Sequence, residues 1–271
     1  MRIQHNIAGL NSYRNLGVNQ KSLSKNLEKL SSGFRINRAG DDAAGLAISE
    51  SMRSQINGLN QAAKNADDAI GLIQTAEGAL TETHSMLQRL KTLATQGANG
   101  TYTDTARGNI KSEIDSLIDE IDRIADSTSF NGVDPLKGTT KFTFQIGATK
   151  GEVLAFSAES MKADDLGVGK NDIKVGNTTD ANTSIDAINS AIDTVSEYRA
   201  SLGANQNRLE HTVNNLNVTA ENITAAESRI RDTDMADEMT AFTKNNILAQ
   251  AAQSMLAQAN AQPQGILSLL Q

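Results

Sequence analysis

The sequence predicts a mainly α-helical fold: a long antiparallel helical rod or coiled coil with a small β-hairpin, and N- and C-terminal helices that pair. Three observations lead to this prediction. Apolar residues recur every 3.5 residues over long stretches, two prolines are present in 271 residues, and the apolar period changes to two in one central segment. A period of 3.5 is typical of a coiled-coil seam, and a period of two is typical of a β-strand.

The longest seam lies in residues 184–231. Alternating steps of three and four from Ile185 to Ile230 give fourteen positions, of which eleven are apolar. A helix of this length extends over about 69 Å, and it cannot bury its apolar stripe against itself. The sequence therefore predicts that this helix packs against other helices of the rod.

Two partner helices are expected earlier in the chain, over residues 46–96 and 104–126. In the first, ten of the thirteen seam positions from Met52 to Ala94 are apolar. A turn rich in glycine and asparagine at residues 97–100 separates the two segments. These helices and the segment 184–231 are expected to form an antiparallel bundle.

A β-hairpin is expected at about residues 140–157. Apolar residues alternate with polar ones in two runs: Phe142, Phe144 and Ile146, then Leu154 and Phe156. The glycines and polar residues that follow, up to Asn182, are expected to form a polar loop that is too short for another domain.

The chain is expected to divide into an N-terminal arm (1–42), a helical rod with the hairpin (43–234) and a C-terminal arm (235–271). Residues 1–40 carry a net charge of +6 and residues 232–271 carry −3, which favours pairing of the arms. Each arm is too polar to hold a fold alone, so we expect both to be mobile in the monomer. Their apolar positions include Ile3, Ile7, Leu10, Leu23, Leu27, Leu30 and Phe34, then Phe242, Leu248, Met255, Leu267 and Leu270.

Composition argues against several classes of function. The net charge of −7 disfavours nucleic-acid binding, and the absence of cysteine excludes disulfides and cysteine-based metal sites. No apolar run is long enough for membrane insertion, and no cleaved signal peptide is visible at the start. The histidines His5, His84 and His211 form no zinc pattern, and matches to an acyl-enzyme pattern at Ser22–Lys25 and a glycosylation sequon at Asn182 are attributed to chance. We expect no catalytic residue, cofactor or metal.

Several long motifs occur in fixed order along the chain. They are Leu-Ser-Ser-Gly-Phe-Arg-Ile-Asn-Arg-Ala-Gly-Asp-Asp-Ala-Ala-Gly-Leu-Ala-Ile-Ser (30–49), Ile-Gln-Thr-Ala-Glu-Gly-Ala-Leu (73–80), Asn-Gln-Asn-Arg-Leu-Glu-His (205–211) and Ala-Ala-Glu-Ser-Arg-Ile-Arg-Asp-Thr-Asp-Met (225–235). With these motifs the sequence resembles flagellin, the subunit of the bacterial flagellar filament, over about 1–150 and 183–271. It resembles a short form without the outer variable domains.

The resemblance implies a structural, non-enzymatic subunit that self-assembles into an extracellular filament for swimming motility. It implies that the arms form the self-assembly surface, through the apolar arm positions named above, and that the chain is secreted unfolded through the flagellar export apparatus. Further copies, cap and hook-junction proteins, and an export chaperone on the C-terminal arm are the implied partners. The alternative is a hook–filament junction protein, which should lack the full motif present at residues 38–45.

Residues 88–96 resemble the stretch through which many flagellins engage the Toll-like flagellin receptor of innate immunity. By this resemblance Arg89 and Leu93 match the basic and apolar contacts, and Glu113 matches the acidic one. The common pattern has a glutamate and an apolar residue where this chain has Thr92 and Thr95. The same face could instead serve lateral contacts between subunits, and we expect it to be exposed in the monomer.

Overall fold

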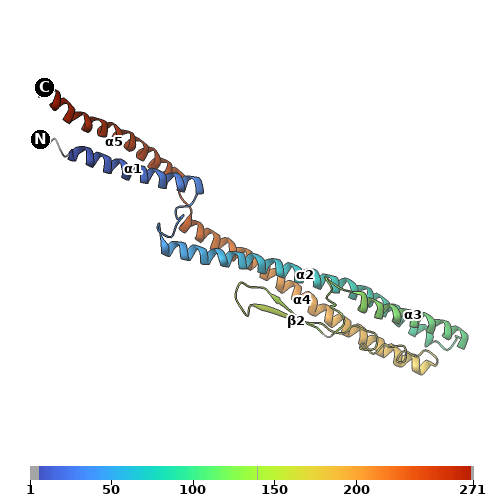
Figure 1. The fold of residues 1–271 in the computed structure, drawn as a ribbon. Coiled ribbons are helices and arrows are strands. Elements are labelled where there is room, and N and C mark those ends of the chain that lie inside the picture. Colours follow the sequence, from blue (N-terminus) through green and yellow to red (C-terminus); the bar gives the residue numbers. More distant parts are fainter. Residues whose placement is uncertain (1–5, 139, 270–271) are drawn as a thin grey trace. The chain divides into compact units, whose positions relative to one another are not determined.

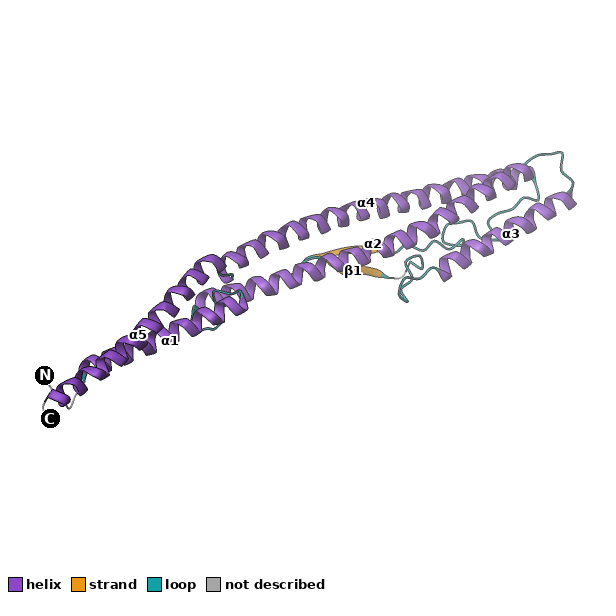
Figure 2. Ribbon diagram, turned by 90° about the horizontal axis from the view of Figure 1, so that it is seen from above, coloured by secondary structure: helices purple, strands orange, loops and turns teal. Residues whose placement is uncertain are grey.

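The computed structural model describes residues 6–138 and 140–269, and the side chains of these residues up to Gln262. Within these limits it contains five helices and one two-stranded sheet (Figures 1 and 2). In chain order they are α1 (Ile7–Ser32), α2 (Ala43–Gly97), α3 (Asp104–Ser127), β1 (Lys141–Gln145), β2 (Val153–Ser157), α4 (Thr178–Arg231) and α5 (Met235–Leu269). The mainly helical fold class is confirmed.

The chain forms two compact units. The arm unit consists of residues 1–56 and 221–271, and the rod unit consists of residues 57–220. Helices α2 and α4 are each more than 50 residues long, and the boundaries between the two units fall within them. Both helices therefore contribute to both units. The arm unit therefore contains α1, α5, the first turns of α2 and the last turns of α4.

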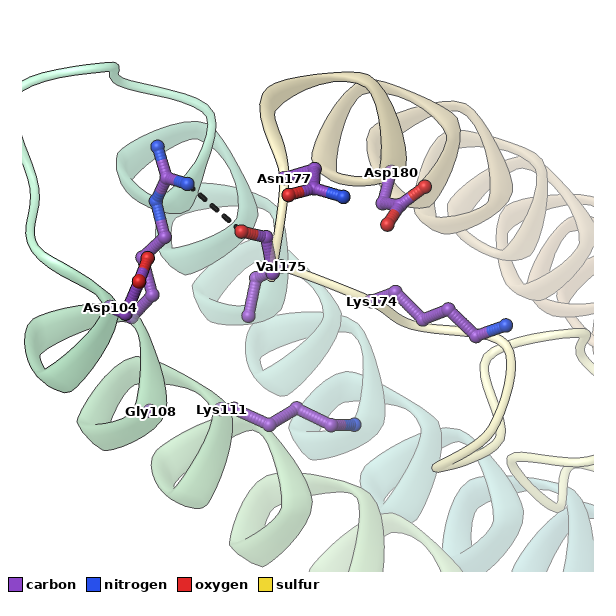
Figure 3. Close-up of a pocket in the computed structure, with 9 residues that line it drawn as sticks. Asp104, Gly108, Lys111, Lys174, Val175, Asn177 and Asp180 are labelled. Atoms are coloured by element: carbon purple, nitrogen blue, oxygen red, sulfur yellow. Dashed lines mark hydrogen bonds between the residues drawn. The ribbon is translucent and has the colours of Figure 1, made fainter.

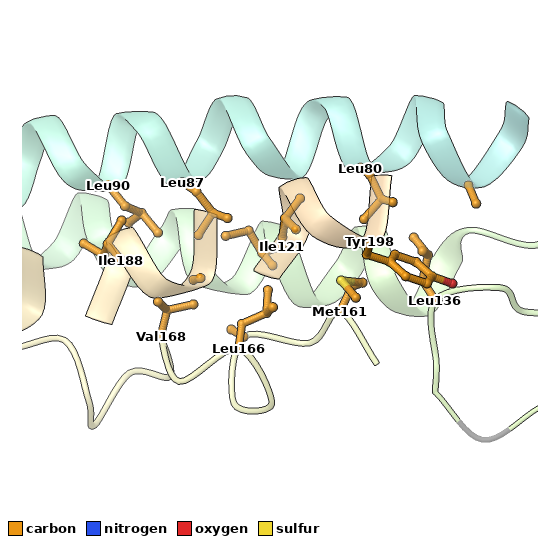
Figure 4. Packing of buried hydrophobic residues seen from close by; sticks show 14 of the residues in the cluster. Leu80, Leu87, Leu90, Ile121, Leu136, Met161, Leu166, Val168, Ile188 and Tyr198 are labelled. Atoms are coloured by element: carbon orange, nitrogen blue, oxygen red, sulfur yellow. The ribbon is translucent and has the colours of Figure 1, made fainter. Parts of the chain in front are cut away.

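The core of the rod unit lies between α2, α3 and α4. Each helix turns an apolar stripe toward the other two, and the innermost side chains are at most 1% exposed (Figure 4). They include Leu80, Leu87 and Leu90 from α2, Ile114 and Ile121 from α3, and Ile188, Val195 and Leu202 from α4. The predicted stripe on α2 is narrower than the observed one, since Ala69, Leu72 and Ala76 are buried beside it. Helix α3 and the loops cover this additional buried side of α2.

The hairpin has the predicted alternation. Strands β1 and β2 pair antiparallel, with Phe142 opposite Phe156 and Phe144 opposite Leu154. The rings of Phe142 and Phe156 lie 5.9 Å apart, and the ring of Phe156 lies 6.0 Å from that of Tyr198 on α4. This aromatic stack holds one face of the hairpin on the helices.

The segment 158–177, which we call the strap, differs from the predicted polar loop. Although its backbone is irregular, seven of its apolar side chains are buried against the helices (Figure 4): Ala158, Met161, Ala163, Leu166, Val168, Ile173 and Val175. Its backbone is also fixed at Ser184, whose hydroxyl accepts from the Lys174 amide (2.8 Å) and donates to the Lys174 carbonyl (2.9 Å). Helix α4 begins at Thr178, so residues 178–182 are helical and not part of a loop.

Candidate functional site

Helices α1 and α5 of the arm unit lie side by side and run antiparallel (Figures 1 and 2). Their less exposed positions recur in alternating steps of three and four, which defines an inner seam. On α1 the inner seam consists of Gly9, Ser12, Leu16, Asn19, Leu23, Asn26 and Leu30. On α5 it consists of Glu238, Phe242, Asn245, Ala249, Ala252, Leu256 and Ala259. Six of these fourteen residues are polar or glycine and three more are alanine, so the inner seam buries little apolar surface.

Polar contacts fix the two ends of the inner seam. The Asn6 side chain donates from Nδ2 to the Ala259 carbonyl at 2.8 Å, and its Oδ1 caps α1 by accepting from the Gly9 amide at 2.9 Å. At the other end, Lys29 Nζ lies 3.5 Å from Glu238 Oε2. These contacts agree with the predicted pairing of a basic arm with an acidic arm, although ion pairs of this kind contribute little each.

Large apolar side chains remain exposed on the same two helices, and together they form what we call the arm outer surface. Ten such side chains are between 41% and 68% exposed. They are Ile7, Leu10, Tyr13, Val18 and Leu27 on α1, and Met235, Met239, Ile247, Leu248 and Met255 on α5. So many large apolar side chains left exposed on two paired helices indicate that these helices bind other proteins.

The proposed self-assembly residues divide between these two surfaces. Leu23, Leu30 and Phe242 lie on the inner seam, whereas Ile7, Leu10, Leu27, Leu248 and Met255 lie on the arm outer surface. Phe34 is half-buried at the end of the arm. Ile3 and Leu270 lie outside the described residues, as does the side chain of Leu267. The inner seam is built largely from small and polar residues, which carry no apolar signal. The sequence pattern therefore could not separate the inner seam from the arm outer surface.

The chain crosses between the arms and the long helices at residues 33–42 and 230–234, which we call the arm base. Gly33 ends α1 in the left-handed conformation (φ 75°), and its amide donates to the Lys29 carbonyl. Phe34 then pairs with Asp232 in an isolated antiparallel β-bridge. The bridge brings the N- and C-terminal connections together at one point.

The motif at residues 38–45 starts α2. Asp42 Oδ1 accepts a hydrogen bond from the Gly45 amide at 2.9 Å, which is the geometry of a helix N-cap. A Cβ atom on Gly45 would lie 2.5 Å from Asp42 Oδ2 and 2.8 Å from Ile36 Cδ1. Any other residue at position 45 would therefore displace the cap or the buried Ile36 side chain.

The preceding residues of this motif tie α1 to the arm base. Asp41 accepts from Lys25 Nζ at 3.1 Å and from the Arg38 amide at 3.2 Å, and both bonds lower the pKa of its carboxyl group. The Arg38 guanidinium bonds Glu28 at 2.7 Å, which raises the pKa of Arg38. All these groups are close to solvent, so they fix geometry more than they stabilise the fold.

The residues proposed for the receptor lie on α2 and α3 of the rod unit. Arg89 Nη2 lies 2.7 Å from Glu113 Oε1, with both side chains about half exposed (52% and 46%). Leu93, in contrast, is 1% exposed and belongs to the core. Our expectation of an exposed face thus fits Arg89 and Glu113 but not Leu93, whose side chain points between the helices because α3 covers that side of α2.

Arg107 and Lys111 line the pocket between the start of α3 and the strap, and both already have hydrogen-bond partners (Figure 3). Arg107 donates to the Gly176 carbonyl at 2.9 Å, and Lys111 donates to the carbonyls of Lys170 (2.8 Å) and Ile173 (2.9 Å). These cations hold the strap in place. Among the described residues, no group of three or more acidic or histidine side chains is placed to hold a metal ion. No described helix is long and apolar enough to cross a membrane.

Comparison with protein families identifies both ends of this architecture. The model of the bacterial flagellin N-terminal helical region matches residues 3–141, and that of the C-terminal helical region matches residues 185–270. The chain belongs to the bacterial flagellins. Flagellin of Bacillus subtilis (strain 168) is 52% identical over 303 residues, and Flagellin FlaB2 of Treponema pallidum (strain Nichols) is 47% identical over 286 residues. In both cases the match covers all of this chain and all of the relative.

Solved structures show the same fold. The Bacillus cereus flagellin crystal structure matches 60% of this chain and 94% of its own, with 30% identity and a TM-score of 0.50. A putative flagellar hook-associated protein from Vibrio parahaemolyticus matches 71% of this chain and all of its own, with a TM-score of 0.60. Its identity is 14%, so that likeness concerns the fold alone. This flagellin is thus a structural subunit of the flagellar filament, a homopolymer, and not an enzyme.

Proposed function

We propose that this flagellin grows its filament by folding that is coupled to assembly, with the arm outer surface as the main contact between copies. The observation that carries the proposal is the exposure of ten large apolar side chains on α1 and α5 of a single chain. Within helices α1 and α5, the described residues that are buried are Gly9, Asn26 and Ala259. A lone chain therefore leaves most of the apolar surface of its arms in water.

The balance of free energies supports this mechanism. Ordering each backbone residue costs about 1–2 kcal/mol, and the inner seam offers little apolar burial in return. Fully burying one large apolar side chain contributes roughly 1.5–3 kcal/mol. Neighbouring copies supply this burial at the arm outer surface, so the arms are mobile in the monomer and become ordered in the filament. The contact joins different faces of successive copies, which builds an open helical polymer.

Truncation tests this proposal. Removing residues 1–30 or 240–271 should leave a soluble chain with a folded rod unit that does not polymerise. Circular dichroism and size-exclusion chromatography check the fold, and electron microscopy after seeding or ammonium-sulfate addition checks polymerisation. Filaments of normal length from either truncated chain would contradict the proposal.

We also propose that the chain is secreted unfolded through the flagellar export apparatus, with a chaperone covering the C-terminal arm before export. Five exposed methionine, isoleucine and leucine side chains on α5 support this, because they would aggregate if left uncovered in the cell. In cells without a functional export apparatus, the chain should remain inside, whereas cells with it should release or assemble it. Immunoblots of both fractions test this, and equal release from both strains would refute it. Cap and hook-junction proteins are the partners expected at the filament ends.

We propose, third, that Arg89 and Glu113 contact the Toll-like flagellin receptor. Their support is an exposed, oppositely charged pair within the stretch that resembles the receptor-binding segment. Because exposed ion pairs contribute about 0–1 kcal/mol to stability, Arg89→Ala and Glu113→Ala should weaken receptor binding without unfolding the rod unit. Glu120→Ala, which breaks the exposed Arg123–Glu120 pair on the same helix α3, is the matched control. Unchanged receptor affinity in both Arg89 and Glu113 variants would count against the site.

A further inference from the structure

Arg231, the last residue of α4, is a meeting point of contacts at the arm base. Its Nη1 lies 2.7 Å from Glu50 Oε1 on α2, and its side chain is 12% exposed. Its guanidinium carbon lies 4.8 Å from the centre of the Phe34 ring. Its backbone carbonyl accepts from the Arg35 amide at 2.7 Å. One residue thus contacts α2 and the segment that follows α1, both of which are far from it in sequence.

Two further hydrogen bonds extend this junction. The Thr233 amide donates to the Gly33 carbonyl at 3.0 Å, and Arg35 Nη2 donates to the Ile230 carbonyl at 2.6 Å. Together with the carbonyl of Arg231, these bonds join the residue that ends α1 to the short connection before α5. The bases of both arms are therefore held beside the end of α4.

A wider charge network supports the Arg231 side chain. Glu50 also lies 3.5 Å from Arg53 Nη1, and Arg53 Nε lies 3.6 Å from Glu227 on α4. Within the described part of the chain, Arg231 Nε is buried and has no hydrogen-bond partner. The orientation of the Arg231 guanidinium therefore depends on two contacts: the ion pair with the Glu50 carboxylate and the stacking on the face of the Phe34 ring. A planar guanidinium can make both contacts at once, which the ammonium of lysine cannot reproduce.

We propose that Arg231 is a positioning residue for assembly: it clasps the base of the arm pair onto the first turns of α2 and the last turns of α4. The clasp limits the directions in which the arm outer surface can be presented to the next copy. A limited set of directions reduces the conformational entropy lost on docking, and this favours growth. The inference rests on the proposed role of the arms, and its failure can be told apart from failure of that role.

The test compares Arg231→Ala and Arg231→Lys with the full-length natural chain. Hydrogen exchange in the monomer reports on the Arg35 and Thr233 amides, which the clasp should protect. Seeded growth gives the critical concentration for polymerisation. For Arg231→Ala we expect the protection of both amides to fall and the critical concentration to rise about tenfold, which is a change of about 1.4 kcal/mol. Arg231→Lys should restore part of both, because it keeps the charge opposite Glu50 but not the stacking on Phe34.

Arg229→Ala is the matched control, because Arg229 is an exposed arginine two residues away on the same helix. It should leave both measurements unchanged, as should the amides of the rod unit in every variant. Normal amide protection and a normal critical concentration in Arg231→Ala and Arg231→Lys would overturn the inference. If Arg231→Ala does not fold, Arg231→Lys and Phe34→Leu decide the question by the same two readouts.

A separate variant tests the underlying role of the arms. Leu10→Asn changes the arm outer surface and lies far along α1 from the clasp. If Leu10→Asn polymerises normally while Arg231→Ala loses amide protection and does not grow, the clasp stands and the proposed surface is wrong. If Leu10→Asn fails to grow while both Arg231 variants behave as the natural chain, the surface stands and the clasp is wrong.

Discussion

At the scale of single residues, the family motif at positions 38–45 has a physical meaning. Asp42 caps α2, Gly45 leaves room for that cap, and Asp41 joins Lys25 to the Arg38 backbone. The sequence identified this motif through resemblance, but it did not reveal what each side chain contacts. The contacts involve groups up to 16 residues apart, and no local pattern encodes them.

Asp42→Ala should destabilise the start of α2. The variant leaves the Gly45 amide without its side-chain acceptor, and loss of an N-cap costs about 1 kcal/mol. Asp42→Asn keeps an oxygen acceptor and serves as the matched control, so it should behave almost as the natural chain. Hydrogen exchange of the first turn of α2 measures the effect. Equal exchange in Asp42→Ala and Asp42→Asn would show that the cap is unimportant.

The hydroxyl of Tyr198 should ionise at a higher pH than that of an ordinary tyrosine. Its hydroxyl donates to the Pro135 carbonyl (3.4 Å) and accepts from the Glu159 amide (3.3 Å), and burial raises the pKa of Tyr198 to about 12. Because this folded-state pKa lies above the unfolded value of about 10, the associated stability is present below pH 10 and is lost as the pH rises toward 12.

Absorbance titration at 295 nm measures this ionisation. The natural chain should show a component that titrates near pH 12 and disappears in Tyr198→Phe. Tyr102→Phe, which changes a half-buried tyrosine in the turn between α2 and α3, is the control and should retain the late component. A late component that persists in Tyr198→Phe would contradict the assignment.

At the scale of elements, the arms show where periodicity succeeds and where it fails. Alternating spacing predicted two pairing helices, and α1 and α5 do pair. The sequence grouped the apolar arm positions into one set, whereas the structure places Leu16 on the inner seam and Leu10 on the arm outer surface. Both faces carry apolar residues, so hydrophobicity alone could not tell which face meets the other helix.

Variants of these two leucines should have different effects. Leu10→Asn removes an exposed apolar side chain, so it should leave the monomer unchanged and raise the critical concentration for polymerisation by about tenfold or more. Leu16→Asn places a further amide on the inner seam near Asn19, so it should also lower the helicity that the arms gain on assembly. Circular dichroism and seeded growth separate the two effects. Equal behaviour of both variants would contradict the division into two surfaces.

The strap illustrates an element that periodicity could not detect. Its buried side chains, such as Met161, Leu166 and Ile173, follow no helical or strand period because the backbone that carries them is irregular. Glycines in the segment suggested a polar loop. Only the position of the strap over α3 and α4 shows that these apolar residues complete the core of the rod unit.

At the scale of the whole molecule, stability should depend on pH through exposed carboxylates. Hydrogen bonds from Lys25, Arg123 and Thr149 lower the pKa of Asp41, Glu120 and Glu152, respectively. Groups whose folded-state pKa is lowered stabilise the fold above the unfolded pKa of about 4, and they lose this effect as the pH falls further. The melting temperature should therefore be level from about pH 5 to 8 and fall below pH 4.

Thermal melts followed by circular dichroism across this pH range provide the measurement. Because these groups are exposed, the acid effect should weaken as the ionic strength rises toward 1 M. Asp41→Asn should reduce the acid sensitivity of the arm unit and leave that of the rod unit unchanged. A melting temperature that stays constant from pH 6 to pH 3 would contradict the prediction.

The sequence alone determined the helices, the hairpin, the pairing of the arms and the family. A repeated apolar spacing sets the secondary structure and the direction of its buried stripe, and long motifs identify the relatives. The tertiary structure decided which face of each arm points inward, that the strap belongs to the core, that Leu93 is buried, and that Arg231 joins the arm base. These features depend on contacts between segments far apart in the chain, where small, polar or irregularly spaced residues carry no periodic signal.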